Sequence, residues 1–104
     1  MLVSDAALID EFVDALWLAD GLSKNTLASY RSDLALFANW LEPRHGSIVG
    51  ADETAINGYL AHLNARPGGI KSTSQRRLMA TLRRCYRWLL DQGRLQADPL
   101  LNIE

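Results

Sequence analysis

The sequence lacks several features that mark secreted and membrane proteins. It contains one cysteine in 104 residues, so it cannot form an internal disulfide, and no asparagine begins a glycosylation motif. Its longest uninterrupted apolar runs, such as residues 15–19, are five residues long. Because a membrane-spanning helix needs about 20 apolar residues, the sequence predicts a cytoplasmic protein with no membrane contact.

Lysine and arginine are missing from the first twenty residues, which carry five acidic residues instead. This charge has the wrong sign for a signal peptide or a transit peptide. The basic residues concentrate in residues 71–94, which hold seven Lys and Arg against one Asp. The net charge of −1 therefore hides a basic segment, whose local field can attract a polyanion.

Motifs of enzymes and metal sites are also missing. There is no Gly-rich phosphate loop, no dinucleotide fingerprint and no Gly-x-Ser-x-Gly turn. His45 and His62 have no Cys or acidic partners at the spacing of a zinc site. Cys85 lies on the apolar stripe of a predicted helix, which favours a buried small side chain over a nucleophile. We therefore expect no catalytic residue, no metal and no cofactor in this chain.

Helical periodicity predicts an all-α fold, and the length predicts a single domain over residues 1–104. Four helices each carry one apolar stripe, which favours a compact four-helix bundle. The predicted helix starts are Ser4, Ser23, Asp52 and the hydroxyl residues at 72–74. The predicted helix ends are Gly21, Pro43, the turn at 67–69 and Gly93. Residues 43–51 are expected to form a loop.

The predicted fourth helix has an arginine face. At 100° per residue, its apolar stripe sets the buried direction, with Leu78, Leu82, Cys85 and Leu89. The opposite side carries Arg76, Arg83 and Arg87, with Arg77 and Arg84 flanking it. A solvated helix face usually mixes acids with bases, yet residues 71–90 contain no acid. This pattern favours contact with nucleic acid over a plain solvated face.

Two predicted helix starts combine a lysine with several hydroxyl and amide groups. They are the segments 23–26 and 71–76. Free backbone N–H groups and the helix dipole favour an anion at such a start, so a phosphate fits there. Ordinary capping explains Ser23 and one hydroxyl at 72–74, but it does not explain Lys24 or Lys71. The second helix also presents short side chains, which allow close approach to a major groove. They are Asn25, Ala28, Ser29 and Ser32.

These segments resemble the start of the tyrosine site-specific recombinases, the phage-integrase family. In the first half the resemblance lies in Leu22 to Leu27, Tyr30-Arg31, Asp33-Leu34, Phe37 and Trp40-Leu41. In the second half it lies in Thr73-Ser74, Arg77-Leu78, Leu82-Arg83, Tyr86-Arg87, Leu89-Leu90 and Asp98-Pro99. Residues 9–12 and 15–17 point to the Xer branch of that family.

The resemblance implies a SAM-like core-binding domain that grips one face of DNA through its second and fourth helices. On the second helix this role carries over to Lys24, Asn25, Thr26 and Arg31. On the fourth it carries over to Lys71, Ser72, Thr73, Ser74, Arg76, Arg77 and Arg83. The helix start adds Gln75 and the arginine face adds Arg87. Phosphate contacts would supply most of the affinity, and Asn25, Gln75 or Arg76 would read base edges.

The family's catalytic residues lie in a C-terminal domain that this sequence does not contain, so we expect no enzyme activity from the chain alone. Tyr30, Tyr59 and Tyr86 lie on apolar faces and are not the nucleophile. The resemblance implies a double-stranded recombination half-site as the ligand, in a bacterial protein that resolves chromosome dimers. It also implies a parent protein within a heterotetramer of XerC and XerD subunits. The isolated domain is expected to be a monomer.

Three further hypotheses remain open. The acidic face of the first helix, with Asp10, Glu11 and Asp14, would face a neighbouring protomer or the catalytic domain. A helical protein-interaction module would use the arginine face for an acidic partner protein and would show no salt-dependent DNA affinity. A helix-turn-helix regulator would form a dimer on palindromic sites.

Overall fold

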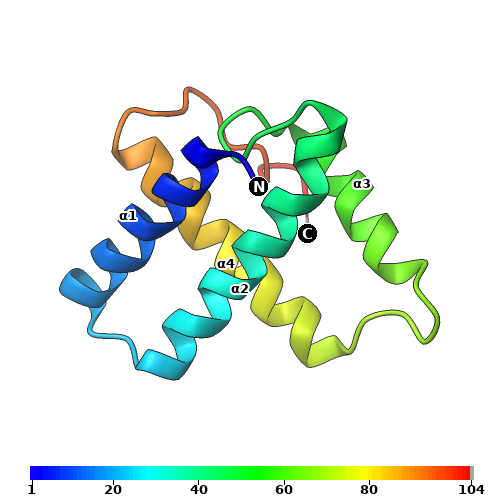
Figure 1. The fold of residues 1–104 in the computed structure, drawn as a ribbon, viewed down its shortest axis with the longest axis horizontal. Helices are drawn as coiled ribbons and strands as arrows, with labels where there is room; N and C mark the ends of the chain where they lie inside the picture. The colour runs from blue at the N-terminus through cyan, green and yellow to red at the C-terminus, as the bar shows by residue number, and fades with distance from the viewer. Residues whose placement is uncertain (104) are drawn as a thin grey trace. The chain divides into compact units, whose positions relative to one another are not determined.

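The computed structural model describes residues 1–103, which form four α-helices and one short 3-10 helix (Figure 1). They are α1 (Val3–Asp20), α2 (Lys24–Leu41), η1 (Glu42–Arg44), α3 (Glu53–Asn64) and α4 (Ser72–Asp91). The described part of the chain contains no strand, which confirms the predicted all-α fold and its four helices. None of these helices is both long and apolar enough to cross a membrane.

Two of the predicted N-caps are confirmed, and a third is wrong. The Ser23 hydroxyl accepts a hydrogen bond from the backbone N–H of Thr26 at 3.2 Å, and Asp52 caps α3 in the same way. Ser4 does not cap α1, because the helix begins earlier, at Val3. The backbone N–H of Ala6 already donates to the carbonyl of Leu2 at 3.0 Å, so Ser4 lies inside the first turn.

Glycine ends α1 as predicted, whereas the segment after α2 differs from the prediction. Gly21 has φ 59°, the left-handed conformation that ends a helix at low steric cost. Before Pro43, α2 ends at Leu41. The residues that follow are not a plain loop, because Glu42–Arg44 continue as a 3-10 turn. Arg44 stabilises that turn by donating to the carbonyl of Trp40 at 2.7 Å, with its guanidinium 4.2 Å from the Trp40 ring centre.

The chain divides into two compact units, residues 1–48 and residues 49–104. In the first unit, α1 and α2 are joined by residues 21–23 and pack against each other. Its most deeply buried side chains are Leu8, Ile9, Phe12, Leu34, Phe37, Ala38, Leu41 and Ile48. The apolar stripes predicted for these two helices therefore supply the core of this unit.

The carboxyl group of Asp5 is buried within the first unit, at 2% exposure. One of its oxygens, Oδ1, accepts a hydrogen bond from the backbone N–H of Ile48 at 3.1 Å, whereas Oδ2 has no hydrogen-bond partner. Burial raises the pKa of Asp5, and Glu42 adds to this rise. The Ile48 hydrogen bond and the Met1 ammonium group oppose the rise without cancelling it. Asp5 thus joins the start of α1 to the end of the unit.

In the second unit, the apolar stripe of α4 lies where the sequence predicts it. Leu78 is 3% exposed, and Leu82, Cys85, Tyr86 and Leu89 are fully buried. Thr81 is the polar exception on this helix, and its hydroxyl donates to the carbonyl of Arg77 at 2.9 Å. Three residues of α3 are also buried, namely Ile56, Tyr59 and Leu63. The rotation of α4 about its axis is fixed by this stripe.

Candidate nucleic-acid interface

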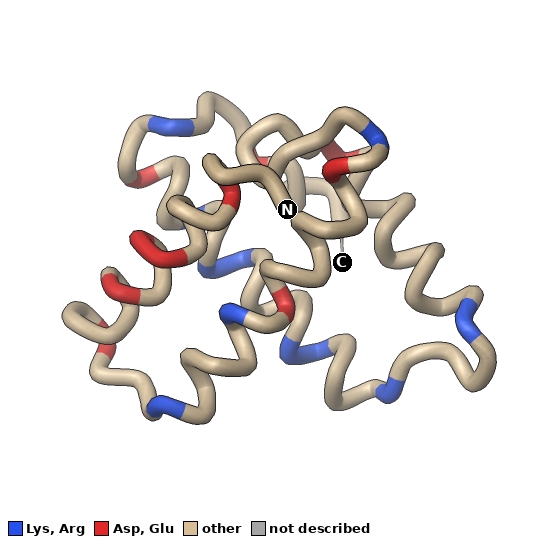
Figure 2. The backbone as a smooth tube through the Cα atoms, viewed as in Figure 1, with Lys and Arg blue, Asp and Glu red and all other residues tan. Residues whose placement is uncertain are grey.

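The arginine residues of α4 are all exposed, because the buried stripe turns the opposite side of the helix to solvent. Figure 2 shows basic positions along α4 and acidic positions along α1. From Arg76 to Arg87 the helix rises about 16 Å, at 1.5 Å per residue. Within residues 49–103, Arg76, Arg83 and Arg87 form no ion pair. These three guanidinium groups are thus able to bind an external anion.

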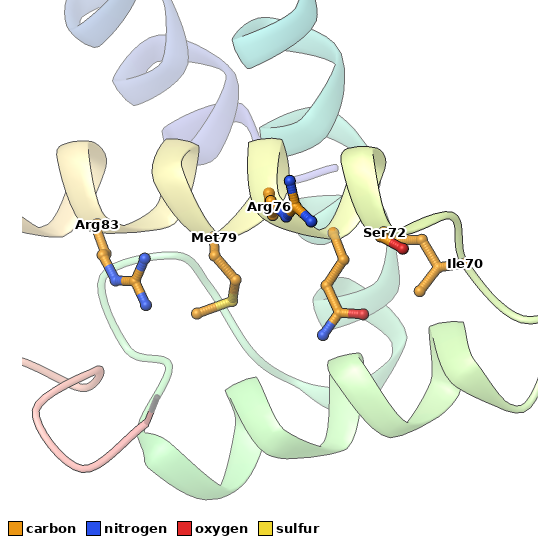
Figure 3. A pocket seen from close by; sticks show the side chains of 6 residues that line it. Ile70, Ser72, Arg76, Met79 and Arg83 are labelled. Carbon is orange, nitrogen blue, oxygen red and sulfur yellow. The ribbon is translucent and has the colours of Figure 1, made fainter.

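A hollow of about 410 Å³ opens beside the first three turns of α4. Its lining is Ile70, Ser72, Gln75, Arg76, Met79 and Arg83. Met79 and Arg83 leave the same side of the helix (Figure 3). The hollow combines two guanidinium groups, an amide and a hydroxyl with apolar Met79, which is only 6% exposed. This combination suits a phosphate with an adjoining apolar group.

A second hollow, of about 340 Å³, lies further along α4. It is lined by Arg83, Arg84, Arg87, Asp98, Leu100 and Leu101. Arg83 lines both hollows, so the basic surface of α4 is continuous. The Asp98 carboxylate accepts from the backbone N–H of Leu100 at 2.9 Å and so orders the segment that borders the hollow.

At the start of α4, none of the hydroxyl groups of residues 72–74 caps the helix. The N-cap residue is Lys71, and no side chain accepts a hydrogen bond from the first turn. The expectation that one hydroxyl at 72–74 caps the helix is therefore wrong. The first intrahelical bond runs from the N–H of Gln75 to the carbonyl of Lys71 at 2.9 Å, which places the hydroxyls inside the helix. The N–H groups ahead of Gln75 thus have no side-chain acceptor.

The predicted site residues of α2 differ in how available they are. Lys24 and Asn25 are exposed. Thr26 is half-buried, and both its backbone N–H and its hydroxyl are bonded to the Ser23 hydroxyl. Arg31 is exposed, but its guanidinium forms an ion pair with Asp10 of α1. The side chains of Ala28 and Ser32 are exposed as well, so the short-side-chain face of α2 reaches solvent.

The predicted site residues fall into two groups, one in each unit. The first unit holds Lys24, Asn25, Thr26 and Arg31, and the second holds Lys71, Ser72, Thr73, Ser74, Gln75, Arg76, Arg77, Arg83 and Arg87. Sequence reasoning missed Met79, Ile70 and Leu101 as parts of the basic surface. The one signal for the last is the apolar pair at 100–101, which follows Pro99 in a polar segment.

The histidine residues are not organised as a metal site. His45 and His62 are both exposed, and the His62 ring stacks on Tyr59 with 6.4 Å between ring centres. Among residues 1–103, no group of three or more His, Cys, Asp and Glu side chains could hold a metal ion.

Tyr30, Tyr59 and Tyr86 are buried, as their apolar positions predict.

Comparison with known proteins adds to this geometry. A family model described as the N-terminal SAM-like domain of phage integrase matches residues 9–93. A tyrosine recombinase XerD of Pseudomonas putida is 45% identical over 96% of this chain and 33% of its own length. The corresponding figures are 40%, 93% and 32% for the XerD of Pseudomonas aeruginosa, and 38%, 91% and 31% for that of Yersinia pestis. The chain thus spans about a third of the length of these relatives. No solved structure matches it.

Proposed function

The chain belongs to the family of phage integrase N-terminal SAM-like domains, and from that premise we propose that residues 1–104 act as one domain that grips a recombination half-site. The observation that carries this proposal is the exposed arginine face of α4, with Arg76, Arg83 and Arg87 outside any ion pair of their unit. The relatives are tyrosine recombinases, and site-specific recombination is the reaction in which such a domain would take part.

The chemistry of the basic surface fits a duplex. Guanidinium groups bind phosphate oxygens through two parallel hydrogen bonds, and each such contact releases counterions from the DNA. Arg76, Arg83 and Arg87 supply these contacts in the proposal, and Lys71 and Lys24 add charge at two helix starts. Asn25 and Gln75 are suited to reading base edges, because amide side chains pair with the major-groove edge of adenine.

The proposal extends to the longer protein that the relatives represent. Its catalytic residues lie outside residues 1–104, and it acts in a bacterial cytoplasm within a tetramer of XerC- and XerD-type subunits. The isolated chain is a monomer in this account. Glu11 and Asp14, both exposed on α1, would face a neighbouring protomer or the catalytic domain.

A protein-interaction module is the second candidate function, and one observation favours it. The hollow along α4 joins three arginines to Leu101, which is 78% exposed. An acidic partner with an apolar side chain would fit this combination, because exposed apolar groups beside charge are typical of docking sites.

Footprinting on a duplex with a Xer-type half-site tests the DNA proposal. We expect protection of guanine N7 in the major groove and of the neighbouring phosphates, on one face of the duplex. Protection away from the major groove would contradict the proposed role of α2 and α4. Absence of protection, together with capture of an acidic peptide, would favour the interaction module.

A further inference from the structure

The ion pair between Asp10 and Arg31 joins the acidic helix of the first unit to a predicted DNA-binding residue. Both side chains are largely exposed, at 65% for Asp10 and 47% for Arg31. Each follows directly after a buried residue, Ile9 in α1 and Tyr30 in α2. Because these neighbours fix the backbone of both helices, the two charged groups are held opposite each other.

The pair changes the charge that α2 can offer to DNA. This helix carries two cationic residues, Lys24 and Arg31. The Arg31 guanidinium is paired with the carboxylate of Asp10, whereas Arg76, Arg83 and Arg87 of α4 form no ion pair within the described part of their own unit. A phosphate that approaches Arg31 must therefore displace Asp10 or share the guanidinium with a second negative charge.

The strength of the Asp10–Arg31 ion pair determines whether a DNA phosphate can displace Asp10. Exposed ion pairs contribute little and weaken further with salt, because water and counterions screen them. A DNA phosphate offers two unesterified acceptor oxygens and lies in a dense row of neighbouring negative charges, so it can compete with one exposed carboxylate. The Asp10–Arg31 ion pair is thus weak enough for a phosphate to replace Asp10, and strong enough for its loss to change the DNA affinity.

We propose that Asp10 is a positioning residue for DNA binding: it holds the Arg31 guanidinium against α1 and releases it only to a bound phosphate. This inference rests on the proposed function, because it assumes that α2 faces DNA. Asp10 thereby lowers the affinity of the chain for DNA and reserves one cationic contact for complexes in which a phosphate lies directly at Arg31.

The test compares Asp10→Asn with Asp14→Asn, a matched control one turn along the exposed face of α1. Binding to a labelled duplex with a Xer-type half-site, and to a scrambled duplex of equal length, is measured over a range of salt concentrations. We expect Asp10→Asn to bind about two- to fivefold more tightly at low salt, the range an exposed ion pair supports. Its log–log salt slope should change by less than about 0.9, the value of one phosphate contact, because the native chain also releases Arg31 to the bound phosphate. Asp14→Asn should not raise the affinity to that extent.

A double-mutant cycle separates positioning from general electrostatics. In an Arg31→Ala background, the substitution Asp10→Asn should no longer increase the DNA affinity. Asp10→Glu in the native background keeps a carboxylate at this position and should therefore bind DNA as tightly as the native chain. Circular dichroism melting of each variant checks that the helices remain folded. An equal gain from Asp14→Asn, a gain that persists without Arg31, or weaker binding by Asp10→Asn would each overturn the inference.

The same data separate this inference from the proposed function. If the native chain binds duplex DNA with a steep salt dependence while Arg31→Ala binds equally well, the role of Asp10 is refuted and the DNA-binding domain stands. If the folded native chain shows no DNA affinity, the proposed function and the role of Asp10 are both refuted.

Discussion

The carboxylate of Asp5 accepts a hydrogen bond from the backbone N–H of Ile48 across 43 positions of the sequence, at 3.1 Å. The group is buried, and its second oxygen has no partner, so its ionised form is poorly stabilised. Stability of the first unit therefore depends on whether Asp5 carries a proton.

The first prediction concerns pH. Burial raises the pKa of Asp5 in the folded chain, so the folded state binds its proton more tightly than the unfolded state does. The contribution of Asp5 to stability is full below its unfolded pKa of about 4 and is lost as pH rises through the folded value. We expect Asp5→Asn to become more stable than the native chain as pH rises from about 4, measured by urea unfolding. Parallel pH profiles of the two proteins would contradict this.

Asp5→Ala is the companion variant, because it removes the acceptor for Ile48 as well as the charge. The N–H of Ile48 would then be left buried without that acceptor, which costs about 1–3 kcal/mol. We expect this variant to be less stable than Asp5→Asn at every pH. Asp14→Asn, at an exposed position of the same helix, controls for the loss of one negative charge.

Gly21 is predicted to be sensitive to substitution for a conformational reason only. Its φ is +59°, and a Cβ atom placed there meets no heavy atom within 4 Å. Gly21→Ala should therefore lower the free energy of unfolding by about 1 kcal/mol through backbone strain, without a clash. Gly21→Asn should recover part of the loss, because asparagine tolerates the left-handed region. A loss of equal size in both variants would point to a cause other than φ.

Arg83 is predicted to be the most sensitive single position of the basic surface, because it lines both hollows of α4. We expect Arg83→Ala to weaken DNA binding by about 1–2 kcal/mol and to reduce the salt slope by about 1. Arg94→Ala is the control: it also removes one arginine, but this residue lies beyond the helix, with its guanidinium 5.6 Å from the Trp88 ring centre. Equal effects of the two substitutions would show that net charge, not position, determines the affinity.

Neutralising the acidic face of α1 tests its proposed role in assembly. Replacing Asp10, Glu11 and Asp14 together by the corresponding amides should leave half-site affinity unweakened, because these groups repel phosphate. In a protein of the relatives' full length, the same change should alter the assembly of subunits on DNA, measured by native gel mobility. A marked loss of half-site binding would contradict this role.

Local signals explain which features the sequence predicts well. Ser23 and Asp52 cap their helices through side-chain contacts three residues away, so a short segment contains the whole signal. The arginine face was also predictable, because the apolar stripe around Leu82 fixes the rotation of α4. The predicted cap at Ser4 was wrong because α1 begins two residues earlier, with a backbone hydrogen bond from Ala6 to Leu2, and no side chain in the sequence marks that start.

Contacts between distant residues explain what the sequence could not predict. Arg31 and Asp10 are 21 positions apart, and their pairing depends on how α1 packs against α2. The burial of Asp5 likewise depends on where Ile48 returns to the start of α1. Leu101 borders the second hollow because the segment after α4 lies beside its arginines, which helical periodicity does not encode.

The most direct test of the DNA-binding account is a titration of the chain with a half-site duplex and a scrambled duplex at several salt concentrations. The account predicts a log–log slope of about −3 to −6, since each neutralised phosphate contributes about −0.9, and tighter binding to the half-site. A folded chain that shows no affinity for either duplex, at any salt concentration, would contradict it.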